Sequence, residues 1–201
     1  MKDTGAALLA GICIGIAGWG NLALAGVGAG IPGAVIFAFG LLSVVHYKFR
    51  LYTGTAGFIS SAKEIPHLLY ILLMNFAGTR LVGLLARISP LPVCAGAGKI
   101  IAARLALGPL KTGLLAIGCG FIMTTAVQFG REGKFLPLLF GVPMFIVCGF
   151  PHCVADAFYL CAAPLEGWWG WSALWFYLSI VLGNFIGCNL TRALLPLGSS
   201  K

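Results

Sequence analysis

Charge is scarce in this sequence, and acidic charge above all. Only 9% of the 201 residues are charged, and only 5 residues are Asp or Glu. Soluble domains carry roughly 25% charged residues, so this composition excludes an ordinary soluble globular domain. The sequence also lacks a nucleophile next to a base, a metal-type cluster and a nucleotide-binding loop. We therefore expect neither an enzyme nor a bound cofactor or metal.

Paired cysteines and nucleic-acid-binding patterns are missing as well. The 7 cysteines are odd in number and include no Cys-x-x-Cys pair, so buried apolar side chains are the favoured interpretation. The formal net charge is +8, but no basic run with interleaved aromatic residues is present. In an apolar chain, an excess of positive charge indicates basic residues that anchor the loops on the inner side of a membrane. We therefore expect no nucleic-acid partner.

Long apolar runs fill the sequence instead. Hydrophobic residues make up 60% of the chain, and the mean hydropathy is +1.00. A helix needs roughly 20 apolar residues to cross a bilayer, and about six runs approach that length. They cover about residues 5–28, 33–46, 67–85, 110–129, 135–164 and 172–195. We expect an all-α membrane protein with six transmembrane helices in lipid, forming a single transmembrane domain over residues 1–201.

Two of these helices are predicted to be broken. In the run 135–164, Gly149 and Pro151 indicate an interruption at membrane depth. An ionisable side chain at that depth is costly and usually faces a cavity or a pathway, so His152 is expected to line a pore. The second break is predicted at residues 47–57, where glycines and threonines follow two cations. A surface loop is the alternative interpretation there.

The two halves of the sequence resemble each other at an offset of about 108 residues. The matching segments are 4–11 with 112–118, and 75–78 with 184–187. Three spans per copy is an odd number, so repeats over about 4–87 and 104–196 would lie inverted in the membrane, with helices two and five broken. Inverted repeats of this kind place the site near the bilayer midplane. The distribution of basic residues favours an N-terminus in the cytoplasm, and six spans return the C-terminus to the same side.

Short motifs along nearly the whole chain resemble the formate/nitrite transporter family. The motifs are Leu51-Tyr52-Thr53-Gly54, Asn75-Phe76-Ala77-Gly78, Ala103-Arg104-Leu105, the segment 149–156 and the segment 183–187. The segment 149–156 is similar to the family's signature around a pore histidine, which is His152 here. Each motif alone has little specificity, but their order and spacing together are fairly specific.

The resemblance implies an aquaporin-like protomer with one pore, assembled as a homopentamer in the bacterial cytoplasmic (inner) membrane. The implied function is a channel or transporter for small monovalent weak-acid anions, such as formate, nitrite, hydrosulfide or a short carboxylate, linked to protons. In this family two apolar constrictions flank the histidine. The corresponding positions are Phe37, Phe145 and Met123 on the outer side, and Leu41, Leu51 and Tyr52 on the inner side, next to Thr53.

His152 has more than one candidate role. A bare anion does not easily pass apolar rings, because burying an isolated charge costs many kcal/mol. His152 would either supply a proton that neutralises the anion, or only orient the anion while water supplies the proton. Outside a pore, the ring would be satisfied by a backbone carbonyl at the break. Thr53 is expected to hydrogen-bond a substrate or His152, or to cap a turn.

Other polar residues near the breaks are assigned roles by position. Arg104 and Lys111 are candidates for drawing anions to the outer mouth and Arg50 to the inner mouth, with lipid headgroup anchoring as the alternative. Asn75 and Asn184 are expected to form hydrogen bonds between helices rather than to bind a ligand.

The sequence departs from the family pattern at four positions, which are Arg50, Gly120, Pro151 and Asp156. Asp156 is expected to pair with Arg80 or Arg192, or to line the pore beside His152. A carboxylate in the pore would oppose anions. Two alternatives therefore remain open: a pore for a neutral or cationic solute such as ammonia, and a membrane subunit that keeps the fold without transporting.

Overall fold

The computed structural model describes residues 2–164 and 170–194, and the regular structure in them is helical. Four long helices are α1 (Lys2–Gly26), α4 (Ile65–Ala86), α6 (Pro109–Arg131) and α9 (Trp171–Leu194). These four are long and apolar enough to cross a membrane. Residues 165–169 and 195–196 of the second predicted repeat, together with the C-terminus, lie outside the described residues.

Shorter helices connect the long ones or lie between them. They are α2 (Gly30–His46), α3 (Tyr52–Ala56), α5 (Val93–Leu107), α7 (Leu136–Val147), α8 (Cys153–Ala162) and the 3-10 turn η1 (Ala62–Glu64). Helix α3 ends at Ala56, and the turn η1 follows at Ala62. A separate turn begins there because Ser61 and Glu64 form a capping box. Hydrogen bonds from Ser60 hold the pKa of the Glu64 carboxyl below its ordinary value.

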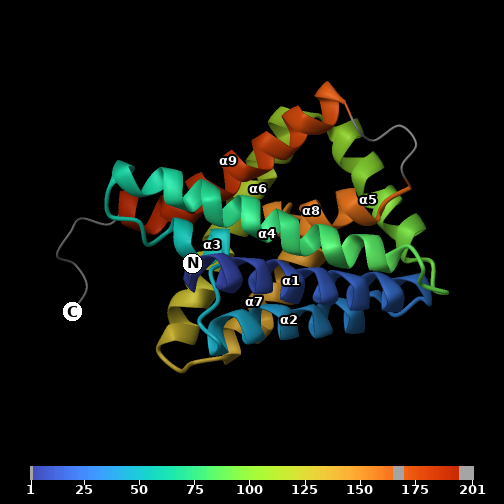
Figure 1. Ribbon diagram of the computed structural model, residues 1–201, viewed down its shortest axis with the longest axis horizontal. Coiled ribbons are helices and arrows are strands. Elements are labelled where there is room, and N and C mark those ends of the chain that lie inside the picture. Colours follow the sequence, from blue (N-terminus) through green and yellow to red (C-terminus); the bar gives the residue numbers. More distant parts are fainter. Residues whose placement is uncertain (1, 165–169, 195–201) are drawn as a thin grey trace.

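Small residues let the long helices approach closely in two pairs, α1 with α4 and α6 with α9 (Figure 1). A Cβ atom at Gly11 of α1 would overlap the backbone carbonyl of Asn75 in α4. In the same way, a Cβ atom at Gly120 of α6 would overlap the carbonyl of Asn184 in α9. Helix α8 packs against α1, α4, α5 and α9 in the middle of the molecule, and all its residues are buried.

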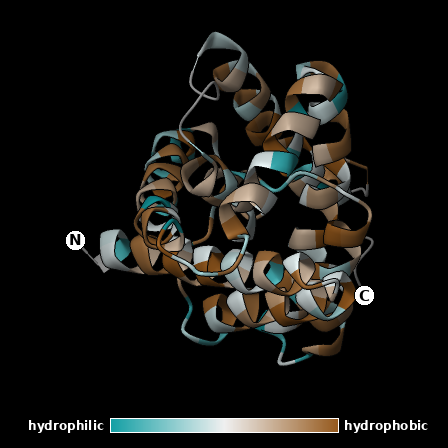
Figure 2. Ribbon diagram, turned by 90° about the vertical axis from the view of Figure 1, so that its right-hand side faces the viewer, coloured by the Kyte–Doolittle hydropathy of each residue, from teal (hydrophilic) through white to brown (hydrophobic). Residues whose placement is uncertain are grey.

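The outer surface of the helices is apolar. Figure 2 shows hydrophobic residues along most of each helix. Large hydrophobic side chains are exposed on several helices, including Phe39 at 68%, Leu110 at 75% and Phe140 at 71%. So much exposed apolar surface on one chain is unfavourable in water, whereas it is favourable in contact with lipid. The fold is that of an integral membrane protein.

Candidate functional site

The helices α2 and α7 end in the same backbone motif. In α7, Gly149 has φ of 68°, its N–H donates to Ile146, and Phe150 N–H donates to Phe145. In α2, Lys48 has φ of 56° and occupies the equivalent place, with Phe49 N–H donating to the carbonyl of Val44. Both patterns are Schellman motifs, in which a residue in the left-handed conformation ends a helix and satisfies its last carbonyls. The chain then runs on to the short helices α3 and α8.

Two asparagines hold the starts of these short helices. Asn75 Oδ1 accepts from Tyr52 N–H at 2.9 Å, and its Nδ2 donates to the carbonyls of Ala7 and Arg50. The bonds to Tyr52 N–H and to the Arg50 carbonyl satisfy backbone groups that have no intrahelical partner. The finding confirms that this amide links helices, as predicted.

Asn184 forms the same set of bonds in the other half of the chain. Its Oδ1 accepts from Cys153 N–H at 2.8 Å, and its Nδ2 donates to the carbonyls of Ala116 and Pro151. The amide of each asparagine therefore joins three segments: a long helix, the end of a break and the first turn of a short helix.

His152 lies where the two short helices meet. Its Nε2 is 3.0 Å from the Thr53 hydroxyl, and both residues are buried. Its Nδ1 accepts from Ala155 N–H at 3.1 Å, so the ring is also the N-cap of α8. Because Nδ1 is an acceptor, the neutral ring carries its proton on Nε2 and donates it to Thr53. Of the partners considered for the Thr53 hydroxyl, the structure shows His152, and the second ring nitrogen bonds to the N–H of Ala155 rather than to a backbone carbonyl.

Aromatic rings continue from His152 toward α2. Phe145 packs against the His152 ring with centroids 5.6 Å apart, and against Phe37 in an edge-to-face arrangement at 5.8 Å. The predicted constriction residues are all buried: Phe37, Leu41, Leu51, Tyr52, Met123 and Phe145. The Tyr52 hydroxyl donates to the carbonyl of Val181 in α9, so the tip of this side chain is directed to the α9 backbone.

Asp156 is paired, but not with the predicted partners. Arg104 Nε donates to its Oδ1 at 3.1 Å, and the carboxylate is 1% exposed. The expectation of Arg80 or Arg192 is wrong, because α5 packs on α8 and brings Arg104 to the carboxylate. Arg104 is thus held in an ion pair rather than standing as a separate charge at the mouth.

The pair also fixes the break before His152. Arg104 Nη1 donates to the carbonyl of Gly149 at 2.8 Å, and the second oxygen of Asp156 accepts from His152 backbone N–H at 2.9 Å. The carboxylate therefore bonds to the backbone of His152, while the ring nitrogens are engaged elsewhere. Both ends of the segment 149–152 are tied to one buried ion pair.

Arginines satisfy carbonyls at the other ends of the short helices. Arg87 donates to Cys161 and Ala163 at the end of α8. Arg131 donates to Gly54 in α3 at 2.9 Å, and Arg192 donates to the carbonyl of Ile59. Helix ends leave carbonyls without partners, and lipid offers none, so these side chains meet a specific need. No sequence pattern predicts this role, since the partner carbonyls lie far away in the chain.

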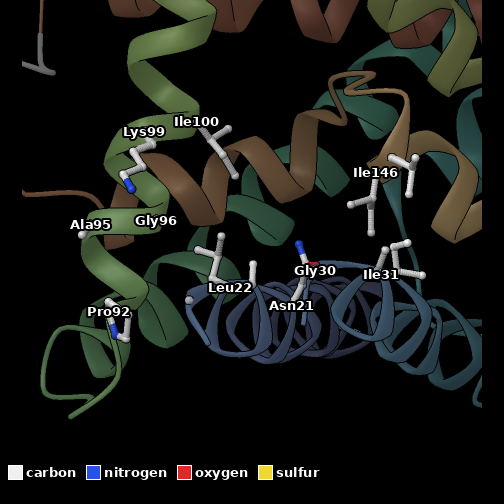
Figure 3. Close-up of a pocket in the computed structure, with 14 residues that line it drawn as sticks. Asn21, Leu22, Gly30, Ile31, Pro92, Ala95, Gly96, Lys99, Ile100 and Ile146 are labelled. Carbon is white, nitrogen blue, oxygen red and sulfur yellow. The ribbon is translucent and has the colours of Figure 1, made fainter. Parts of the chain in front are cut away.

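A cavity of about 660 Å³ is lined by the residues drawn in Figure 3. We call it the α5 cavity; α1, α2, α5 and α7 all line it. Asn21 and Lys99 supply its polar groups, and Ile146 lies next to Phe145 in the chain. Lys99 was not among the predicted site residues, whereas Lys111 and Arg104, which were, are absent from the lining. Nothing in the sequence around Lys99 indicates that this side chain faces a cavity.

A second cavity, of about 530 Å³, lies at the opposite end of α2. We call it the α3 cavity; the end of α2, the segment 48–50, α3 and the end of α6 line it. Ala34 lines the α5 cavity and Val44 lines the α3 cavity. Ten helical residues correspond to about 15 Å. Phe37 and Leu41 are buried on α2 between the two cavities.

Comparisons with known proteins agree on a class. A family model described as formate/nitrite transporter matches residues 4–197. A curated relative, the uncharacterized transporter YrhG of Bacillus subtilis (strain 168), is 27% identical over 188 residues, which cover 84% of this chain and 67% of the relative.

Two solved structures share the fold. One, described as a pentameric formate channel with formate bound, matches with a TM-score of 0.82 at 20% identity, covering 96% of this chain and 94% of the other. The other, described as an FNT family ion channel, matches with a TM-score of 0.77 at 20% identity, covering 96% and 88%.

Fold and relatives define an integral membrane protein of the channel and transporter class, not an enzyme. The chain belongs to the formate/nitrite transporter family. The resemblance inferred from the short motifs is therefore confirmed.

Proposed function

We propose that this protein is a channel for small monovalent weak-acid anions, such as formate, nitrite, hydrosulfide or a short carboxylate, and that His152 lies in its pathway. The proposal rests on the buried contact between His152 and Thr53, and on two cavities that lie toward opposite ends of α2. The pathway would run from the α5 cavity past Phe145 and Phe37, then past His152, to the α3 cavity. Family membership supports this class of function.

The same proposal includes six spans arranged as two inverted repeats, with the second and fifth spans broken. Helices α7 and α8 have 12 and 10 residues. In series such helices would reach about 33 Å, close to the thickness of a bilayer core. The matching bonds of Asn75 and Asn184 support equivalent positions in the two halves. The Schellman motifs at Lys48 and Gly149 support the same equivalence.

The chemistry of the site favours water as the source of the proton. A protonated ring would carry hydrogen on Nδ1, which would then face the N–H of Ala155. His152 is therefore suited to stay neutral and to donate one hydrogen bond from Nε2. An anion that enters the α5 cavity near Lys99 would take up a proton from water and pass the aromatic rings as its neutral acid. His152 and Thr53 would orient that acid through hydrogen bonds.

The charges around His152 are consistent with this mechanism. Asp156 is neutralised by Arg104, and its carboxylate bonds to backbone rather than to the ring. A paired carboxylate opposes a passing anion much less than an isolated one would. The apolar Phe37–Phe145 contact blocks bare ions, because desolvating a charge there costs many kcal/mol.

Assembly and location are proposed from the relatives. The formate channel with the matching fold is described as pentameric, and we expect a homopentamer of this chain, each protomer with its own pore. We also expect the bacterial cytoplasmic membrane, with both termini in the cytoplasm. The α5 cavity would then face outward and the α3 cavity inward.

A second candidate is a pore for a neutral solute such as ammonia. The observation in its favour is the apolar aromatic contact itself, which would admit a neutral molecule as readily as a protonated acid. The two candidates differ in the effect of pH. Acid outside raises the supply of a neutral weak acid but lowers the supply of neutral ammonia.

Uptake into proteoliposomes under an imposed pH gradient tests the proposal. Formate, nitrite, hydrosulfide, acetate and ammonium would be compared, with empty liposomes as the control for passive leak. We expect protein-dependent uptake of at least one weak acid that rises as the outside is acidified. Ammonium uptake alone, rising as the outside becomes alkaline, would favour the second candidate. No protein-dependent flux of any solute would favour a subunit that does not transport.

A further inference from the structure

The α3 cavity carries more positive charge than a passage for a small anion requires. Three cationic residues line it, Lys48, Arg50 and Arg131, together with His46. Within the described part of the chain its lining includes no Asp or Glu. The α5 cavity, by contrast, has Lys99 as the cationic residue of its lining.

Of these three cations, Arg50 is paired with an acidic residue. Asp3 bonds to Arg50 at 3.0 Å, and both side chains are about half exposed. Arg131 donates to the carbonyl of Gly54, and its guanidinium stacks on the Phe58 ring at 3.7 Å. These partners orient Arg131 without neutralising it. Like charges gathered in one concave site raise the local concentration of anions, and a multivalent anion gains most from such a field.

The size of the cavity also exceeds what a one-carbon anion needs. Its volume of about 530 Å³ falls in the usual range of sites for small organic ligands. Arginine supplies several N–H donors in a fixed fork that matches phosphate oxygens, and one of those of Arg131 is engaged with Gly54. A phosphate group fits both the charge and the donors.

The cavity is also linked to the buried site. Gly54 and Thr55 of α3 line it, and Thr53, next in the chain, contacts His152. A ligand that binds Arg131 would therefore act on Gly54, the residue next to Thr53, which contacts His152. It would also fill the space through which a transported anion leaves.

We infer that the α3 cavity is a binding site for a phosphate group, either inorganic phosphate or a phosphate monoester, whose occupancy slows transport from the cytoplasmic side. This inference rests on the proposed function for its inhibitory effect but not for binding. Lys48, Arg50 and Arg131 would supply the charge. Arg131 would also relay occupancy to α3 through Gly54.

Isothermal titration calorimetry on the purified protein tests binding without any need for transport. Inorganic phosphate and formate would be titrated at the same ionic strength into wild type, Lys48→Asn and Lys134→Gln. Asparagine tolerates the positive φ of Lys48, so the helix stop should survive the first change. Lys134 is the matched control, because it pairs with Glu132 and is absent from the cavity lining.

We expect saturable phosphate binding that is about tenfold weaker in Lys48→Asn, unchanged in Lys134→Gln, and at least tenfold tighter than formate binding in wild type. Absence of saturable binding overturns the inference, and so does equal affinity for formate and phosphate. The second comparison uses wild type alone, so it holds even if Lys48→Asn does not fold. Titration of phosphatidylglycerol tests a lipid source, and binding of that lipid without binding of free phosphate overturns the inference.

Uptake measurements separate this inference from the proposed function. Proteoliposomes loaded with phosphate should take up formate several-fold more slowly than liposomes loaded with gluconate at equal ionic strength and pH. Equal uptake rates would overturn the inhibitory role. If phosphate binds but no weak acid enters under any condition, the binding site stands and the proposed transport function fails.

Discussion

The ion pair of Arg104 and Asp156 gives a sharp test of how the segment before His152 is held. Replacing Arg104 by Gln leaves a carboxylate that is 1% exposed without its charged partner. It also removes the bond to the carbonyl of Gly149. Leaving a buried charge unpaired costs about 3–5 kcal/mol, or roughly 6–20 °C in melting temperature for a chain of this size.

Asp156→Asn should cost less than the loss of Arg104. Its amide oxygen can still accept from the backbone N–H of His152, and Arg104 is partly exposed, at 14%, so water can reach its charge. Loss of a hydrogen bond to a charged group costs about 1.5–3 kcal/mol. The double variant removes both charges together and should therefore be more stable than Arg104→Gln alone.

Thermal unfolding of the detergent-purified single and double variants gives the interaction free energy between Arg104 and Asp156. The expected interaction between the two positions is about 1.5–3 kcal/mol, within the range for residues in contact. Arg80→Gln is the matched control, because this exposed arginine was the partner expected from sequence, and its loss should leave the melting temperature unchanged. Additive effects of the two single changes, within about 0.5 kcal/mol, would refute the reasoning.

Three further predictions concern packing, the constriction and the entrance. Gly187→Ala should lower the melting temperature of the purified protein, because a Cβ there overlaps the carbonyl of Ile117, whereas Gly5→Ala, which meets nothing within 4 Å, should leave it unchanged. Phe145→Ala should raise the flux of acetate relative to formate in proteoliposomes by widening the aromatic contact, and an unchanged ratio would place the constriction elsewhere. Lys99→Gln should raise the half-saturating concentration of the transported anion several-fold at low salt and less at high salt, and a shift independent of salt would argue against an electrostatic role.

The sequence predicted the features that depend on local composition. Long apolar runs predicted the long helices. Glycine and polar residues next to or inside an apolar run predicted the positions where α2 and α7 end. Asn75 and Asn184 were placed correctly as links between helices, because an amide in an apolar span has few alternatives to hydrogen bonding.

Features that depend on distant contacts could not be predicted. The partner of Asp156 was assigned to Arg80 or Arg192, yet it is Arg104, which approaches because α5 packs on α8. The bonds of Arg87 to the end of α8 join residues more than 70 positions apart, at separations of 74 and 76. Such contacts follow from the packing of helices, and the sequence pattern of an isolated arginine does not contain them.

The most direct test of the central claim is formate uptake by His152→Asn beside wild type under an acid-outside gradient. Asparagine is a good N-cap, so α8 should still form and the variant should assemble like wild type in size-exclusion chromatography. The account predicts that protein-dependent uptake falls at least tenfold, because the hydrogen bond that orients the neutral acid is lost. Uptake equal to wild type, with the same response to pH, would contradict the placement of His152 in the pathway.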